Sequence, residues 1–301
     1  MATEHFNQVI KGNVMKLKGF ILAALFCVTG TQAAQQKVIY GDDNRRDVYE
    51  ESDTMLLELA KSTAALISTR GLSDDGQGMM KINGRKLGQA RNFCADEPYG
   101  NQIAAANCSG FLVAPNVLVT AGHCVRSLSD CKNYNFVFDF KTTHSGQTEY
   151  KVPKSSVYSC KKVVKTVLNN WGDKMDYAVI ELDRKVTDRA PLKYRTSGKV
   201  ANGEDLVVIG HPSGLPTKIA DGAYVRNNSQ SAYFSANLDT YGGNSGSAVF
   251  NSRTGVIEGI LVRGETDYAR NGSCTVSYRC SNDGCRGEDV TRITNVAEIL
   301  N

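Results

Sequence analysis

Residues 240–250 read TYGGNSGSAVF, a glycine-rich turn followed by a short apolar run. Gly242, Gly243 and Gly246 surround Ser245, and glycine lets a loop adopt positive φ and turn its N–H groups inward. The amides of Gly243 and Ser245 can then form a donor pair for a developing oxyanion, each worth about 3 to 4 kcal/mol of barrier. A plain glycine hairpin would explain the turn, but it would not require a serine between two glycines. The segment therefore predicts a nucleophilic serine.

A nucleophilic serine needs a base that takes its proton and a carboxylate that orients this base. Beyond the N-terminal leader described below, the chain has His123, His144 and His211. His123 directly follows the apolar run in VLVTAGHC, whereas the other two lie in the polar, turn-like segments TTHSGQ and GHPSGLP. Because a base must be held on a rigid edge, His123 is the candidate.

Asp176 is the candidate orienting carboxylate, because it begins the apolar run DYAVIEL. A buried carboxylate is costly unless it is paired, and a histidinium would supply the partner. An ordinary aspartate at the start of a strand is the alternative reading of this local pattern.

The rest of the chain predicts an all-β protein. Short β-rich runs recur between Gly, Asn and Asp turn signals, as is typical of a sandwich or barrel. The final segment TRITNVAEIL places Ile293, Val296, Ala297 and Leu300 at helical spacing, which predicts a short C-terminal helix packed on the core.

Taken together, these segments resemble the chymotrypsin and trypsin family of serine proteases. CSGFLV and TAGHC resemble its strand and histidine motifs, DYAVIEL its aspartate motif and GGNSGSAVF its serine motif, in the order His123, Asp176, Ser245. An α/β-hydrolase would have the order Ser, Asp, His. The resemblance implies two six-stranded antiparallel β-barrels and an endopeptidase that forms an acyl-enzyme intermediate. It also implies a disulfide between Cys108 and Cys124, with Cys131 and Cys160 as a weaker suggestion.

One residue departs from the trypsin pattern. Trypsin-like enzymes usually carry an aspartate before the serine, which pairs with a freed N-terminal amine and orders the oxyanion loop. This chain has Asn244, and an amide cannot form that ion pair. NSGS resembles instead the bacterial glutamyl-endopeptidase branch. VIYGDDNRR also resembles a mature start of such enzymes, which implies cleavage near Lys37.

Substrate preference is harder to predict. In glutamate-selective relatives a histidine lines the pocket on the strand after the serine. The matching stretch here, EGILVRG, has no histidine, which argues against a preference for glutamate. Asp239, six residues before Ser245, resembles the carboxylate at the base of the trypsin pocket, which would select Arg or Lys. A structural turn aspartate, or one neutralised by Arg263, is the alternative. The expected pocket residues are Asp239, Thr240, Leu261, Val262 and Arg263.

The N-terminal region predicts export. From Met15, a basic start precedes an apolar run of about eleven residues and then small residues at an expected cut after Ala33 or Ala34, which is the pattern of a secretory signal. A membrane anchor would need about 20 apolar residues. The residues before Met15 fit no normal signal, so translation is expected to begin at Met15.

We assign residues 1–34 to the signal peptide and 35–58 to an N-terminal arm or pro-segment. The barrel with His123 and Asp176 is assigned to 59–185, and the barrel with Ser245 to 186–301.

Cysteines and charge limit the possible partners. Eight cysteines follow the leader, which in an exported protein predicts four disulfides; without a CxxC pair, no metal or cofactor is expected. The net charge is +4, the leader contributes +2 of it, and the basic residues are scattered, which disfavours nucleic-acid binding. A secreted monomer without a membrane anchor, acting on proteins or peptides, is expected.

Two other functions stay open from the sequence. One is a catalytically inactive homologue that acts as a binding module, although such homologues typically lose a triad residue. The other is a serine esterase on a different fold, which the residue order disfavours.

Overall fold

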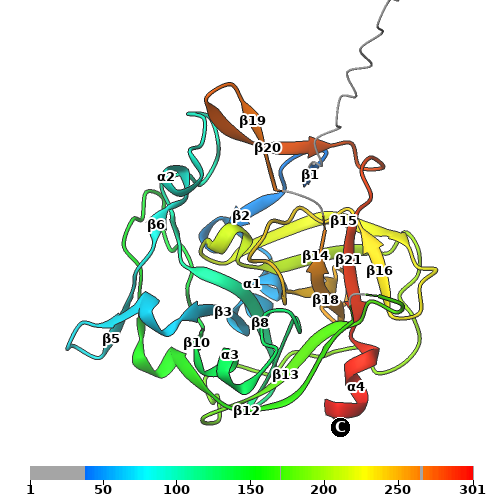
Figure 1. Ribbon diagram of the computed structural model, residues 1–301, viewed down its shortest axis with the longest axis horizontal. Coiled ribbons are helices and arrows are strands. Elements are labelled where there is room, and N and C mark those ends of the chain that lie inside the picture. The colour runs from blue at the N-terminus through cyan, green and yellow to red at the C-terminus, as the bar shows by residue number, and fades with distance from the viewer. Residues whose placement is uncertain (1–37, 170, 265–266, 301) are drawn as a thin grey trace, which may run out of the picture. The chain divides into compact units, whose positions relative to one another are not determined.

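The described part of the protein is built around two antiparallel β-barrels (Figure 1). The computed structural model describes residues 38–169, 171–264 and 267–300. The predicted signal peptide and the predicted cleavage near Lys37 lie outside these residues. Within the described ranges, none of the helices has the length and apolar character needed to cross a membrane.

The first barrel consists of six strands in the order β10-β12-β13-β9-β8-β3, and pairing of β10 with β3 closes it. The fully buried side chains of Leu66, Phe111, Val119, Phe136 and Ile180 contribute to its core. A six-stranded barrel is narrow enough for side chains to fill completely. Its strands are β3 (Thr63–Ser68), β8 (Ala106–Ala114), β9 (Val117–Thr120), β10 (Tyr134–Val137), β12 (Val157–Leu168) and β13 (Asp176–Leu182).

The second barrel has the strand order β14-β17-β18-β21-β16-β15, and β14 pairs with β15 to close it. A further strand from the N-terminal arm, β2 (Arg45–Asp47), pairs with β15, so the arm belongs to this sheet. The barrel strands are β14 (Asp205–Gly210), β15 (Lys218–Asn227), β16 (Tyr233–Ala236), β17 (Ala248–Asn251), β18 (Ile257–Arg263) and β21 (Glu288–Arg292).

Smaller elements surround the barrels. Three strands form one small sheet, β1 (Val38–Tyr40), β20 (Cys274–Cys280) and β19 (Tyr268–Asn271). Others are β4 (Leu72–Asp74), β5 (Met79–Ile82) and β11 (Lys151–Pro153), and the pair β6 (Arg85–Lys86) and β7 (Ile103–Ala104). The helices are α1 (Thr54–Lys61), α2 (Leu87–Arg91) and α3 (Leu128–Lys132). The 3-10 turns are η1 (Val48–Glu50), η2 (Thr69–Gly71), η3 (Lys154–Ser156) and η4 (Pro212–Gly214).

The predicted fold is confirmed, including the short C-terminal helix, α4 (Thr294–Leu300). Val296 and Ala297 of this helix are buried, and Val296 joins the hydrophobic core that Ile293 also enters. The apolar stripe seen in the sequence is therefore a core contact.

Four disulfides are present among the described residues. Cys108–Cys124 and Cys131–Cys160 are the pairs that the resemblance implied. The other two pairs were open from the sequence. Cys94–Cys274 joins the segment after α2 to β20, and Cys280–Cys285 closes a short loop after β20. Four bridges are typical of proteins in oxidising compartments.

A buried histidine lies where the two barrels meet. His211, after β14, stacks on Phe140, after β10, with ring centroids 5.7 Å apart. Its Nδ1–H donates to the Leu215 carbonyl at 2.9 Å. Burial lowers the pKa of His211 from 6.5 to about 4, because the imidazolium would lose its hydration. The side chain is therefore neutral in the folded protein at neutral pH.

This histidine should make the stability depend on pH. Between pH 6.5 and about 4 the unfolded chain binds a proton at His211 that the folded chain does not, so the free energy of unfolding falls as the pH falls. We expect a loss of about 3 kcal/mol across this range, measured by urea unfolding. His211→Asn keeps a donor for Leu215 and should have a flatter dependence. An unchanged slope in this variant would show that another group titrates.

Candidate active site

His123 lies in a tight turn at the end of β9. A Cβ at Gly122 would lie 2.1 Å from the Val167 carbonyl oxygen and 2.9 Å from that of Tyr177, so only glycine lets the chain pass so close to β12 and β13. On the other side of His123, Cys124 is bonded to Cys108 on β8. The sequence TAGHC therefore presents the imidazole from a rigid turn.

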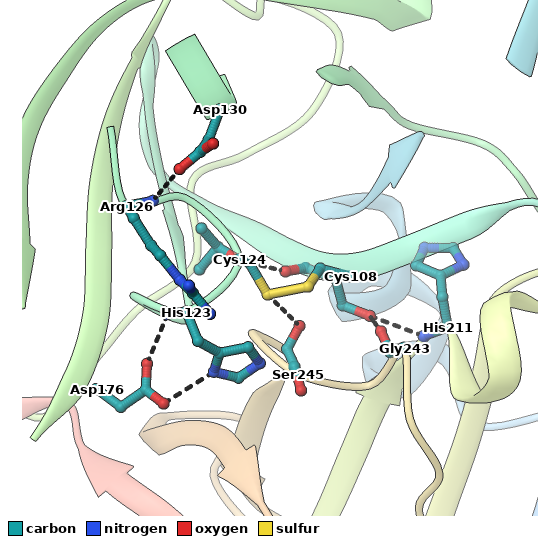
Figure 2. Close-up of a disulfide and its surroundings, with 11 residues drawn as sticks. Cys108, His123, Cys124, Arg126, Asp130, Asp176, His211, Gly243 and Ser245 are labelled. Atoms are coloured by element: carbon teal, nitrogen blue, oxygen red, sulfur yellow. Dashed lines mark hydrogen bonds and ion pairs between the residues drawn. A yellow bond between two sulfur atoms is a disulfide. The ribbon is translucent and has the colours of Figure 1, made fainter. Parts of the chain in front are cut away.

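Asp176 is the first residue of β13 and accepts two hydrogen bonds from His123 (Figure 2). The backbone N–H of His123 donates to Oδ1 at 3.0 Å, and Nδ1 lies 2.8 Å from Oδ2. Asp176 is 2% exposed. Burial by itself would raise the pKa of Asp176, but the hydrogen bonds and charge of His123 lower it below its ordinary value. The ionised carboxylate selects the tautomer with a proton on Nδ1, which leaves Nε2 as the proton acceptor.

The Ser245 loop has two amides without an acceptor. Gly243 and Gly246 have φ of +95° and +89°, conformations that favour glycine. In the part of the chain that the structure describes, the N–H groups of Gly243 and Ser245 donate to no protein group. The other amides of the loop, those of Gly242, Asn244, Gly246 and Ser247, all donate to protein oxygens.

Ser109 on β8 connects this loop to the first barrel. Its N–H donates to the Ser245 carbonyl at 2.8 Å, and its hydroxyl donates to the Gly243 carbonyl at 2.8 Å. The same hydroxyl accepts a hydrogen bond from the backbone N–H of His211 at 3.0 Å. A Cβ at Gly246 would lie 2.1 Å from the Ser109 carbonyl oxygen. The glycines thus allow the loop of one barrel to lie directly against a strand of the other.

The structure brings the three candidate residues together. Figure 2 shows Ser245 on the side of the His123 ring that faces away from Asp176. Cys124 Sγ, one residue after His123, lies 3.7 Å from the Ser245 carbonyl oxygen. Among the described residues, the Ser245 hydroxyl makes no hydrogen bond to His123; such bonds are often long without substrate and tighten when it binds.

Sequence comparison identifies the family to which this arrangement belongs. The model of the trypsin-like peptidase domain matches residues 108–260, just over half of the chain. The chain belongs to the trypsin-like peptidase family.

Other comparisons agree with this assignment. The glutamyl endopeptidase of Bacillus licheniformis is 28% identical over 151 residues, which are 48% of this trypsin-like chain and 45% of that protein. The match thus spans less than half of this curated relative. A solved Glu endopeptidase in complex with MPD has 16% identity and a TM-score of 0.51, covering 87% of this chain and 97% of its own. The Vibrio cholerae VesB protease has 13% identity and a TM-score of 0.50, covering 86% and 66%. These two structures show the shared fold.

A narrow pocket of this trypsin-like domain lies beside Ser245. Thr240, Leu261, Val262 and Arg263, which the sequence suggested, all line it. Glu288 also lines it; this residue is 2% exposed and accepts a hydrogen bond from the Thr240 hydroxyl at 3.2 Å. The remaining lining residues are Tyr241, Gly242, Ser245 and Gly264.

Asp239 does not line this pocket, in contrast to the sequence-based expectation. Its Oδ1 accepts the Tyr40 N–H at 2.7 Å, and its Oδ2 accepts the Asn44 N–H at 2.9 Å. Burial raises the pKa of Asp239 to about 7, although these two hydrogen bonds oppose the shift. Both oxygens thus serve the N-terminal arm, which is the structural role weighed as the alternative.

Sequence reasoning missed Glu288. It lies in GEDVTR, where Glu288 and Asp289 are both buried on β21, and no local pattern distinguishes the two. Gly264 lets the backbone lie close to Glu288, because a Cβ at position 264 would lie 1.7 Å from Glu288 Oε2. This close approach places Glu288 at the pocket. Only a comparison of strand neighbours across the barrel could have found it.

Arg263 lies between acidic groups. Its Nη2 donates to the Lys174 carbonyl at 2.7 Å and lies 3.6 Å from Asp176 Oδ2, and its Nη1 lies 3.7 Å from Asp289 Oδ2. Its positive charge is therefore shared with two carboxylates at the edge of the pocket.

The remaining polar candidates have other roles. The exposed His144 contacts the neighbouring Thr143 hydroxyl, and His211 is buried between the barrels. Cys108, His123 and Cys124 lie close together, but the two sulfurs are bonded to each other and offer no thiolate to a metal.

A test of the Ser245 loop is to fill the space at Gly243. Gly243→Ala places a Cβ 2.6 Å from the His211 carbonyl oxygen at a φ of +95°. Gly203→Ala is the control, because Gly203 has a φ of +74° but nothing lies within 4 Å of its Cβ position. We expect the control to lose about 1 kcal/mol of unfolding free energy and Gly243→Ala at least about 2 kcal/mol more, in urea titrations. Equal losses would contradict the close contact.

Proposed function

We propose that this chain is a serine endopeptidase in which Ser245 is the nucleophile, His123 the base and Asp176 the orienting carboxylate. One observation carries the proposal. The doubly hydrogen-bonded pair of Asp176 and His123 lies beside a serine loop whose Gly243 and Ser245 amides have no acceptor within the described residues. This is the set of groups that acyl transfer requires.

The proposed mechanism assigns each proton to an atom. His123 Nε2 takes the hydroxyl proton as Ser245 Oγ bonds to the peptide carbonyl carbon, and Asp176 stabilises the imidazolium. The amides of Gly243 and Ser245 donate to the oxyanion. The carbon–nitrogen bond then breaks, and His123 gives its proton to the leaving amine. Water attacks the resulting ester with the same base, and the serine is regenerated.

For the substrate, we propose a preference for Arg or Lys before the scissile bond, with Glu288 rather than Asp239 as the selecting carboxylate. A buried carboxylate that lines the pocket favours a cationic side chain and disfavours an acidic one. The name of the Bacillus relative suggests glutamate instead. Arg263 is the group that could bind glutamate, but two carboxylates already lie within 4 Å of its guanidinium.

We also propose that the protein is exported. The basic and apolar pattern from Met15 supports a secretory signal, and four disulfides suit an oxidising compartment.

The triad proposal predicts that a fluorophosphonate probe labels Ser245 in the mature protein. Ser245→Ala should abolish labelling and peptide cleavage, and Asp176→Asn should lower kcat by about 10⁴-fold because His123 loses its tautomer. Ser197→Ala, in an exposed loop, is the control and should behave as wild type. A folded wild-type protein that neither labels nor cleaves would indicate the inactive binding module instead.

The substrate proposal predicts the ranking of reporter peptides with Arg, Lys, Glu or Leu before the scissile bond. Arg and Lys should have the highest kcat/KM, and Glu288→Gln should lower it by about 10 to 100-fold for these two peptides while changing that of Leu little. Fastest cleavage of the Glu peptide would assign the selectivity to Arg263.

A further inference from the structure

Residues 38–47 of the N-terminal arm lie against the segment that precedes the serine loop. Strand β1 of the arm pairs in parallel with β20, and β2 pairs with β15 of the second barrel (Figure 1). Between them, Gly41 adopts a φ of +71° and donates its N–H to the Cys280 carbonyl at 2.8 Å. The arm is therefore held by main-chain hydrogen bonds at both ends.

Asp239 binds the main chain of this arm. Each of its two oxygens accepts one backbone N–H, from Tyr40 and Asn44, and the side chain is 4% exposed. A buried carboxylate that lost both donors would be strongly destabilised. The conformation around Asp239 thus depends on the presence of the arm.

Arg45 makes the second contact. It is 6% exposed, and its guanidinium carbon lies 4.3 Å from the centroid of the Tyr241 ring. Asp43 holds the guanidinium in place through hydrogen bonds at 2.8 and 2.7 Å. Tyr241 also stacks on Tyr268, with ring centroids 4.9 Å apart. A desolvated guanidinium over an aromatic ring is attractive, so Arg45 holds Tyr241 in position.

The contacted residues lead directly into the site. Thr240, Tyr241 and Gly242, here called the pocket wall, line the pocket beside Ser245. The Tyr241 carbonyl accepts the Asn244 N–H at 3.0 Å, which couples the wall to the serine loop. Asp239 therefore directly precedes the wall in the chain, and Arg45 contacts Tyr241 within it.

We propose that Asp239 and Arg45 are positioning residues that clamp the N-terminal arm onto the pocket wall and so order the substrate pocket. This inference rests on the proposed function. The clamp uses the internal N–H groups of Tyr40 and Asn44, so it needs no free N-terminal amine. Asn244, which cannot pair with such an amine, instead accepts the Ser247 hydroxyl at 3.2 Å within its own loop.

The arm offers a matched pair of variants. Arg45 and Arg46 are consecutive residues of β2, so their side chains point to opposite faces of the strand. Arg46 pairs with Asp221 at 2.8 Å and with Glu51 rather than with the wall. Arg45→Ala should raise KM for reporter peptides at least about 10-fold, with fluorophosphonate labelling of Ser245 within about 3-fold of wild type. Arg46→Ala should leave both within about 3-fold.

Hydrogen exchange tests the clamp independently of catalytic activity. Amide hydrogen exchange of residues 238–246, followed by mass spectrometry, should accelerate in Arg45→Ala and not in Arg46→Ala. If the wild type neither cleaves nor labels, the proposed function fails, and exchange still decides the clamp. Equal exchange in the two variants, or equal loss of cleavage and labelling in Arg45→Ala, would overturn the clamp.

The independence from a free amine has its own test. In the protein cleaved before Val38, three additional residues at the new N-terminus should leave KM within about 3-fold of its unextended value. Asp239→Asn presents an NH₂ group to one of the two donors, so it should raise KM as Arg45→Ala does. Loss of activity on extension alone would show that a free amine is required and would overturn this part of the proposal.

Discussion

The candidate site depends on the hydrogen bonds of Ser109. This residue belongs to a strand of the first barrel, yet its N–H and hydroxyl both donate to carbonyls of the serine loop, which belongs to the second. Gly243 and Gly246 allow the contact, because any side chain there would overlap the neighbouring backbone. Without this connection, the serine loop would lose two of the hydrogen bonds that hold Ser245 in register with the pair of His123 and Asp176.

Each buried charged group around the site has its own set of partners. Asp176 stays ionised because His123 donates to both of its oxygens, and Asp239 has its donors in the main chain of the arm. Glu288 lies at the pocket with the Thr240 hydroxyl, and Arg263 lies between Asp176 and Asp289. Each charge would be costly to bury by itself, so each requires a defined set of neighbours. The same requirement gives nearby carboxylates different partners: one binds His123, one binds the arm and one lines the pocket.

The N-terminal arm shows how a segment without a clear pattern can pack beside the candidate site. The sequence predicted an arm or pro-segment there, with no strong period. The structure places β2 on the edge of the second barrel and Arg45 over Tyr241. β2 has only three residues, Arg45, Arg46 and Asp47, and all three are charged, so they show no hydrophobic periodicity although two of them are buried. Their position is set by the partner strand, which in this case is β15, more than 170 residues away.

The sequence by itself determined the fold class, the family and the three candidate side chains, because these depend on local patterns: short β-rich runs, a glycine-flanked serine, and motifs in a defined order. It also determined the C-terminal helix, because four apolar residues near the C-terminus lie at helical spacing. Only the tertiary structure decided the pairing of Cys94 with Cys274, the location of Asp239 against the arm, and the presence of Glu288 at the pocket. These features depend on which distant strands become neighbours when a barrel closes, and a contact of this kind leaves no periodic trace in either of the segments that form it.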